Sequence, residues 1–471
     1  PQQSVDIALS EYAPGRELVV DKDTYRVGGI YVDPFPGATL ANRVSSFFKR
    51  EHNTFVFCAR CGYTHKEKTV KDIDAIVSEN HSCPLCQSPL VAEEILDPPG
   101  FAPERGRMLE PGQLGESFSQ SGTLTQVQLV LPLTDKDDFA RKTSGGNIEW
   151  SFAEHRELLI ANKGVQGQGF SVCSSCGAAA LENPDWLHRS HDRPFLVPNW
   201  MSAPRKCTAP DGIWHGYLGH IFHSDLLLLR LHWPTDVAYD VGHSWMRDAL
   251  DTIAQALLLA ATRLLDIATT ELQVGWSHTI AAERETTAAL SRVPRIANFF
   301  LFDTLSGGAG FATQVGQHIE RLLALAQDIL DHCPEQCERS CYRCLRTYAN
   351  RIQHHHLDRR LAGTLLRAII AGYAPAALSV EQQARQLEAL CQYLELVGNN
   401  NCQLEGVMQG MKVPLLLTLG RETSAIGSYP VQQDRHLAAH PLDRLPIKQV
   451  QLFSDYELAH NLPRVAQSLL R

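Results

Sequence analysis

Four cysteines in the C-terminal half of the chain have the spacing of a metal site. Cys333, Cys337, Cys341 and Cys344 lie within twelve residues, in the run CPEQCERSCYRCLRTYANR. Thiolates at this spacing can close around one tetrahedral ion such as Zn²⁺. Four protein ligands leave no open position for water, so the cluster predicts a structural site rather than a catalytic one.

A second group of cysteines lies near the N-terminus. Cys58 and Cys61 form one Cys-x-x-Cys pair, and Cys83 and Cys86 form another. Each pair is typical of a knuckle that turns two sulfurs toward the same point. Two knuckles together predict a zinc ribbon with four thiolate ligands. Two unrelated reduced pairs are the alternative.

A third group begins with the pair Cys173 and Cys176, and Cys207 is the next thiol along the chain. His188 and His191 lie between them, in the run DWLHRSHDRP. We expect a site of three cysteines and His191, with His188 as the alternative ligand. Eleven of the thirteen cysteines fall in the three groups. This clustering favours three structural Zn²⁺ sites in a reducing cytoplasm over disulfides.

Arginines surround the four clustered cysteines of the C-terminal half. If Glu338 to Arg351 is helical, several of these arginines fall at i, i+4 and i+7 and share one stripe. Guanidinium groups suit phosphate oxygens, so the stripe predicts contact with DNA or RNA. The alternatives are a solvated basic face and pairing with nearby carboxylates. The predicted nucleic-acid contacts are Arg339, Arg343, Arg346 and Arg351.

Size and charge set limits on the whole chain. Its 471 residues predict about three domains. The net charge is −9, so DNA contact must come from local basic patches. No apolar run approaches the ~20 residues of a membrane helix, and no targeting peptide is evident. We therefore expect a cytoplasmic protein without a membrane partner.

Hydrophobic periodicity predicts an α+β protein. Alternating residues predict strands in ELVVDKDTYRVGGIYV and TLTQVQLVLPL, and the apolar run in YLGHIFHSDLLLL predicts a buried strand. From Trp245 the period becomes helical, then ANFFLFD predicts a strand and 311–332 a helix. The expected fold is a β-rich N-terminal part with an inserted zinc ribbon, followed by a mixed α/β helical zinc-binding domain. The expected domains are 1–172 (ribbon insert at about 50–95), 173–235, 236–372 and 373–471.

Motifs for nucleotide hydrolysis are missing from the sequence. Gly307-Gly308-Ala309-Gly310 follows a predicted strand, which is typical of a tight turn or of an anion site. No Lys-Ser/Thr follows the glycines, so the run is not a Walker A loop, and we expect a turn. A D-E-x-H motif is also absent. ATP hydrolysis is therefore expected only through a motor outside this chain.

The run FDTLSGGAGF, CPEQCERSCYRCLRTYAN and LDRRLA resembles the zinc-binding (MZB) domain that ends Mrf-type superfamily 2 DNA helicases. The family pattern is a strand ending in Asp, GGAG, a helix and four clustered cysteines. LSEYAPGRELVVDKDTYRV resembles the segment after the motor, and CSSCG and YLGHIFHSDLLLL resemble the middle region, with Ser224 in place of threonine. The ligand positions of the pattern are occupied by Cys333, Cys337, Cys341 and Cys344.

The resemblance implies a zinc-binding, DNA-contacting accessory region of a bacterial DNA helicase or translocase, in anti-phage defence or DNA repair. The motor would precede Pro1 on the same polypeptide or belong to a separate partner, as in Druantia-type and DISARM-type defence helicases. The chain begins with Pro1 rather than Met, which favours the first arrangement. Other defence-system subunits are then further expected partners. The alternative is a zinc-stabilised protein-interaction scaffold that docks a separate helicase.

Overall fold

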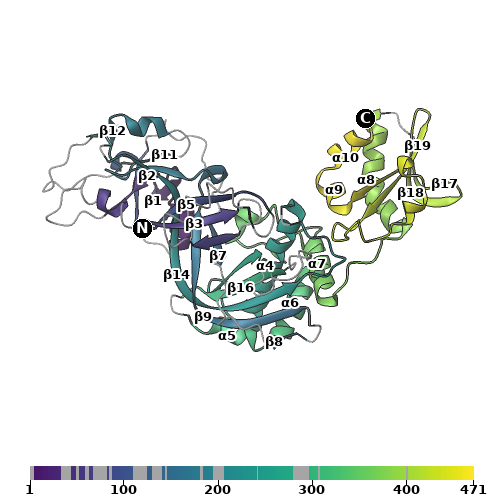
Figure 1. Ribbon diagram of the computed structural model, residues 1–471, viewed down its shortest axis with the longest axis horizontal. Helices are drawn as coiled ribbons and strands as arrows, with labels where there is room; N and C mark the ends of the chain where they lie inside the picture. Colours follow the sequence, from purple (N-terminus) through teal and green to yellow (C-terminus); the bar gives the residue numbers. More distant parts are fainter. Residues whose placement is uncertain are drawn as a thin grey trace.

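The chain combines one large sheet, helices packed on it and a smaller C-terminal unit (Figure 1). Both helices and strands are abundant, which confirms the expected α+β class. Among the described residues, none of the helices is long and apolar enough to cross a membrane. The computed structural model describes residues 5–32, 44–48, 52–58, 63–66, 82–83, 87–109, 125–129, 141–143, 146–180, 184–194, 206–209, 211–240, 242–278, 296–305, 308–398 and 401–470.

Two long antiparallel strands form the centre of the large sheet: β9 (Ile148–Asn162) and β14 (Ile213–His232). β14 also pairs antiparallel with β10 (Phe170–Cys173) and β16 (Ile296–Asp303), and parallel with β5 (Leu90–Leu96). One sheet thus joins segments expected in three different domains, and the division into four domains stays a prediction. The remaining strands of this sheet are β3 (His52–Cys58), β4 (Thr64–Lys66), β7 (Thr125–Leu129), β8 (Arg141–Lys142), β11 (Ala179–Ala180) and β15 (Leu272–His278).

Smaller elements surround the cysteine-rich N-terminal part. Asp21 and Lys22 both have positive φ and make the tight turn of the predicted hairpin. One three-stranded sheet contains β1 (Glu17–Val20), β2 (Asp23–Ile30) and β6 (Phe101–Pro103). A two-stranded sheet contains β12 (His191–Asp192) and β13 (Lys206–Cys207). The short helices are α1 (Val5–Glu11), η1 (Glu104–Gly106), η4 (Val165–Gly167) and η5 (Pro184–His188).

Residues 226–229 of β14 are buried on both faces of the sheet, since side chains alternate across a strand and all four are buried. Leu227 and Leu229 belong to the core that the sheet shares with its covering helices. Leu226 and Leu228 pack with Phe300 of β16 in a separate cluster on the opposite face. An apolar run without alternation is therefore what this strand requires.

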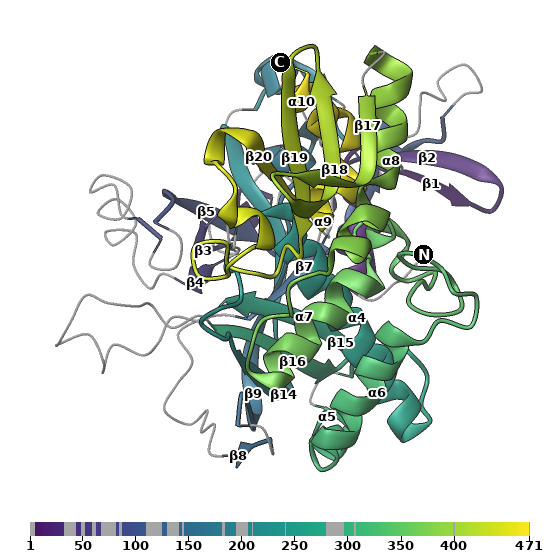
Figure 2. The same cartoon turned by 90° about the vertical axis from the view of Figure 1, so that its right-hand side faces the viewer.

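Four helices cover one side of the sheet, in front of β15 and β16 in Figure 2. α4 lies between the sheet and two other helices, which explains why it is apolar nearly all round. The single helix expected over 311–332 is two helices, because His318 has non-helical φ and ψ of −125° and 38°. The helices are α4 (Ser244–Leu265), α5 (Phe311–Gly316), α6 (Ile319–Asp331) and α7 (Arg359–Ala371), with η7 (Arg351–Gln353) before α7.

The C-terminal unit lies to one side of the body in Figure 1 and has its own core. Its sheet has the order β17-β18-β19-β20, and β20 runs parallel to β19. Leu387 and Leu390 of its long helix pack against Leu415 and Ile426 of the sheet. Its elements are α8 (Val380–Gly398), β17 (Asn401–Met408), β18 (Met411–Leu419), β19 (Glu422–Tyr429), η8 (Pro441–Arg444), η9 (Ile447–Gln449), β20 (Val450–Ser454), α9 (Asp455–His460) and α10 (Leu462–Leu469).

Candidate metal centres

The four cysteines that follow α6 converge on one point. Their sulfur atoms all lie within 4.8 Å of one another. The sulfurs of Cys333 and Cys341 are 3.5 Å apart, and those of Cys337 and Cys344 are 3.7 Å apart. Four sulfurs in this arrangement fit a tetrahedral Zn²⁺ with no open ligand position. We call residues 333–360, which carry this centre, the four-cysteine knob.

The four thiols lie so close together that their pKa values differ from one another. Burial raises the pKa of Cys344 to about 12. Burial also opposes ionisation of Cys333, yet hydrogen bonds from the backbone and thiol of Cys337 and from Cys341 outweigh it and lower its pKa to about 6. A dication would remove this conflict by taking all four sulfurs as thiolates, so metal binding here releases protons.

Arg359 supports the four-cysteine knob from inside. It is only 8% exposed. Its Nε donates to the carbonyl of Cys337 at 2.8 Å, and one terminal nitrogen donates to the carbonyls of Leu330 and Asp331, each at 3.1 Å. The guanidinium therefore joins the last turn of α6 to the cysteine loop. Its three partners are backbone carbonyls, which no side-chain pattern in the sequence reveals.

The second centre is formed where β10, β12 and β13 meet. The ligand atoms of Cys173, Cys176, His191 and Cys207 all lie within 4.8 Å of one another, and all four residues are buried. The sulfurs of Cys173 and Cys207 are 3.8 Å apart, and Nε2 of His191 lies 3.3 Å from the sulfur of Cys176. His188 is exposed and outside this group. The structure thus brings His191, rather than His188, to the three sulfurs.

Electrostatics in the second centre also favour a cation. Thiols of Cys173 and Cys176 donate to the sulfur of Cys207 and lower its pKa to about 2. Hydrogen bonds with Cys173 and Cys207, together with burial, raise the pKa of Cys176. One thiolate is therefore favoured at the expense of its neighbours, and a bound dication would allow all three to ionise.

The zinc ribbon expected near the N-terminus is only partly described. Cys58 ends β3 and Cys83 follows a short bridge between Ser82 and Pro89. Cys58 and Cys83 are each 1% exposed and pack in one cluster. Cys61 and Cys86 lie outside the described residues, so a ligand set for this centre remains a prediction.

The arginines of the four-cysteine knob do not form the expected helical stripe. Residues 338–350 are all described and form turns and bends, so the predicted helix is wrong. The four converging cysteines and Arg359 impose turns on this segment. Arg339 is tied to Asp358 at 3.3 Å and to the carbonyl of His355. Arg351 meets Glu11 at 2.8 Å.

Two other arginines of the set differ in exposure. The side chain of Arg343 is 75% exposed and meets Glu335 at 3.8 Å. Arg346 is half-buried and donates from Nε to the hydroxyl of Ser340 at 3.0 Å. Surface pairs of this kind are weak, so Arg343 is the readiest of the four to meet a phosphate.

The glycine loop before α5 holds a carboxylate of the chain itself. Asp303, at the end of β16, is 1% exposed. One of its oxygens accepts from the backbone N–H groups of Ala309, Gly310 and Phe311, and the other accepts from Ala312. These donors would otherwise form an anion site. The loop is therefore a turn whose anion position is filled from within.

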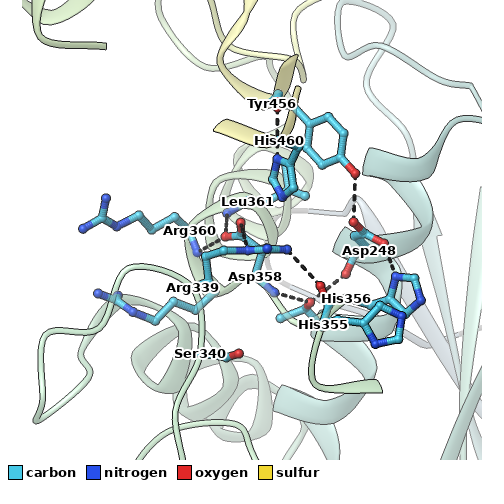
Figure 3. Close-up of polar contacts among 12 residues, drawn as sticks. Asp248, Arg339, Ser340, His355, His356, Asp358, Arg360, Leu361, Tyr456 and His460 are labelled. Atoms are coloured by element: carbon cyan, nitrogen blue, oxygen red, sulfur yellow. Dashed lines mark hydrogen bonds and ion pairs between the residues drawn. The ribbon is translucent and has the colours of Figure 1, made fainter. Parts of the chain in front are cut away.

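A buried polar network connects the four-cysteine knob to α4 and to the C-terminal unit (Figure 3). Asp248 of α4 accepts from His356 at 2.8 Å and from the hydroxyl of Tyr456 at 2.9 Å. Figure 3 shows His356 and Tyr456 approaching Asp248 from different parts of the chain. The hydrogen bond that His356 donates to Asp248, aided by the charge of that carboxylate, raises the pKa of His356.

Comparisons with known proteins agree with this geometry. Residues 253–345 match the family described as "MZB: MrfA Zn-binding domain", a range that contains all four cysteines of the knob. The chain is 32% identical over 480 residues to Druantia protein DruE of Escherichia coli (strain UMEA 4076-1). That match covers 100% of the chain and 25% of DruE, so the chain spans a quarter of this relative's length.

A crystal structure of the DUF1998 helicase MrfA bound to DNA is also similar. It matches over 77% of this chain and 31% of the MrfA chain, with 12% identity and a TM-score of 0.32. With so low a TM-score, this structural likeness carries no conclusion about function. The sequence match and the convergent cysteines agree on one region of the chain. Residues 253–345 therefore belong to the MZB family of zinc-binding domains.

Proposed function

We propose that this chain is the zinc-stapled, DNA-contacting region of a bacterial superfamily 2 helicase or translocase in anti-phage defence. The observation that carries the proposal is the MZB domain with its four converged sulfurs. The match to DruE along the whole chain supports a defence role rather than DNA repair. The ATP-driven motor lies outside these 471 residues, either on the same polypeptide or on a separate partner that acts with other defence subunits.

In this proposal zinc has a structural role at three centres. Cys333, Cys337, Cys341 and Cys344 hold one ion, and Cys173, Cys176, Cys207 and His191 hold a second. The ribbon of Cys58, Cys61, Cys83 and Cys86 holds the third. Both described centres supply four protein ligands, which supports folding rather than catalysis. The described cysteines are free thiols, which is consistent with a reducing cytoplasm.

DNA contact is assigned to the four-cysteine knob. The knob carries six arginines against three carboxylates, while the chain as a whole carries a net charge of −9. Arg343, Arg346 and Arg351 are the contacts we test, because Arg339 is held by Asp358 and His355. Because the metal and Arg359 fix the loop, these arginines meet phosphates at little ordering cost.

The test is DNA binding across a salt series. Replacing Arg343, Arg346 and Arg351 with Glu should weaken binding and reduce the slope of log K against log salt by about 2–3, since each phosphate contact contributes ~0.7–0.9. The matched control reverses three exposed arginines of the C-terminal unit: Arg385, Arg421 and Arg444. Equal slopes for the two triple variants would show that the four-cysteine knob does not contact DNA.

The scaffold alternative has one observation in its favour. Arg339 and Arg351 already have carboxylate partners within the chain, Asp358 and Glu11. If the wild-type chain retains no DNA at low salt but co-purifies with a helicase subunit, the scaffold function replaces the DNA-contacting one.

A further inference from the structure

Two exposed tyrosines lie on the surface of the four-cysteine knob. Tyr342 is 68% exposed and Tyr348 is 76% exposed. They are six positions apart in a segment of turns, and each is next to or near an arginine. Neither ring contributes to the apolar clusters that stabilise the fold. Their exposure therefore has no account in folding alone.

Tyr342 is held in place by the metal centre. It follows Cys341 and lies two positions before Cys344, and both sulfurs belong to the four-sulfur group. The backbone N–H of Cys341 donates to the sulfur of Cys344 at 3.2 Å, which tightens this loop. The ring of Tyr342 meets the ring of His354 edge-on, with centroids 5.3 Å apart.

Tyr348 is held in place by Asn350. The side chain of Asn350 accepts from the backbone N–H of Thr347 at 2.8 Å and donates to the carbonyl of Leu345 at 2.9 Å. It also donates to Gln255 of α4 at 3.1 Å. Asn350 is 7% exposed, so the turn that carries Tyr348 is anchored in the core. Both rings are thus presented on fixed backbone.

A cation lies beside the ring of Tyr348, and an arginine follows Tyr342 in sequence. The guanidinium carbon of Arg351 lies 4.5 Å from the centroid of Tyr348. Arg343, next to Tyr342 in sequence, has a side chain that is 75% exposed. Exposed aromatic rings interleaved with arginines are the combination that binds single strands: bases stack on the rings and phosphates meet the guanidinium groups.

We propose that Tyr342 and Tyr348 stack unpaired bases, so that the four-cysteine knob holds single-stranded DNA in preference to duplex. The inference rests on the DNA contact proposed above and names the strand state which that contact recognises. Phosphates are accessible in both forms of DNA. Base faces are accessible to a protein ring only where the strands are unpaired, so the rings add affinity for the single strand alone.

The test uses the full 471-residue chain and the double variant Tyr342→Leu/Tyr348→Leu. Fluorescence anisotropy compares an oligothymidylate with a duplex of equal length. The variant should lose roughly 10-fold or more in single-strand affinity and none for the duplex. Tyr342→Phe/Tyr348→Phe should keep wild-type affinity, because phenylalanine retains the ring. Tyr373→Leu is the matched control, since Tyr373 is 65% exposed but lies after α7, outside the knob.

An oligonucleotide with abasic sugars separates stacking from phosphate contact. It keeps the charges but has no bases, so the wild-type chain should bind it as weakly as the double variant binds oligothymidylate. Unchanged zinc content and circular dichroism show that the variants fold. If the double variant keeps single-strand affinity while the arginine reversals lose it, stacking is wrong and the DNA contact stands. If the wild-type chain binds neither form, both proposals fail.

Discussion

At the scale of single residues, a backbone carbonyl fixes the tautomer of His191. Nδ1 of His191 lies 2.8 Å from the carbonyl oxygen of Arg189. Because a carbonyl only accepts, Nδ1 carries the proton and Nε2 keeps its lone pair. Nε2 lies 3.3 Å from the sulfur of Cys176. An imidazole fixed in this tautomer is ready to bind a cation.

His191→Ala should therefore cost the chain one metal ion. With three thiolates left, zinc affinity at this centre should fall by about 10-fold or more. The measurement is elemental analysis after gel filtration against a mild chelator. His188→Ala is the matched control, because His188 is three positions away and exposed. Equal metal content in the two variants would show that His191 is not a ligand.

Arg359 and Arg360 are adjacent in sequence but differ in environment. Arg359 supplies three backbone carbonyls with donors from a buried side chain, whereas Arg360 is exposed. Arg359→Leu should lower the free energy of unfolding by about 2–4 kcal/mol, because carbonyls left without a donor are costly. Arg360→Leu should change it by less than about 0.5 kcal/mol. Urea denaturation followed by circular dichroism measures both, and similar losses would refute the supporting role of Arg359.

At the scale of elements, the turn between β16 and α5 depends on one buried carboxylate. Asp303→Asn keeps the shape but removes the charge that four backbone N–H groups share. The variant should lose about 1.5–3 kcal/mol of stability, since hydrogen bonds to a charged acceptor are the stronger ones. Asp328→Asn is the control, because the Asp328 side chain is 63% exposed on α6. Thermal unfolding measures both variants. If Asp303→Asn loses no more stability than Asp328→Asn, the turn does not depend on the charge of Asp303.

The elements with a clear period were predictable, and the segments governed by ligands were not. The helical period from Trp245 and the apolar run of β14 are local signals, and both elements form as expected. The helix on which the arginine stripe depended does not form over 338–350, because the converging cysteines and the carbonyls bound by Arg359 outweigh local propensity. Cysteine spacing predicted which cysteines converge, since few arrangements satisfy four nearby thiols. The partners of Asp303 and Arg359 are backbone groups, which no residue pattern encodes.

At the scale of the whole molecule, Asp248 connects three regions. Its partners His356 and Tyr456 are 108 and 208 positions away along the chain. The C-terminal unit also contacts the body through Gln432, whose side chain donates to the carbonyl of Leu361 and whose carbonyl accepts from Ala238. The contact of this unit with α4 therefore shares a carboxylate with the loop that follows the cysteines.

The state of His356 makes that contact depend on pH. The hydrogen bond to Asp248 raises the pKa of His356 above its usual value of about 6.5. A raised pKa means that the protonated form is favoured in the folded chain. Its stabilisation is fully present below the unfolded pKa and is lost as pH rises through the higher folded pKa. His356→Gln should therefore lower the unfolding temperature more at pH 5.5 than at pH 8.5 (pH values chosen roughly to bracket the titration).

Hydrogen exchange locates the same effect in the structure. In the wild-type chain, amides of α9 should exchange faster relative to those of α10 as pH rises past the folded pKa, after correction for intrinsic exchange. The reason is that Tyr456, in the first turn of α9, donates to Asp248. His332→Gln is the matched control, since His332 is 78% exposed and pairs with Asp328 on the surface of α6. If His356→Gln and His332→Gln show the same pH profile, the carboxylate shared at Asp248 does not couple the knob to the C-terminal unit.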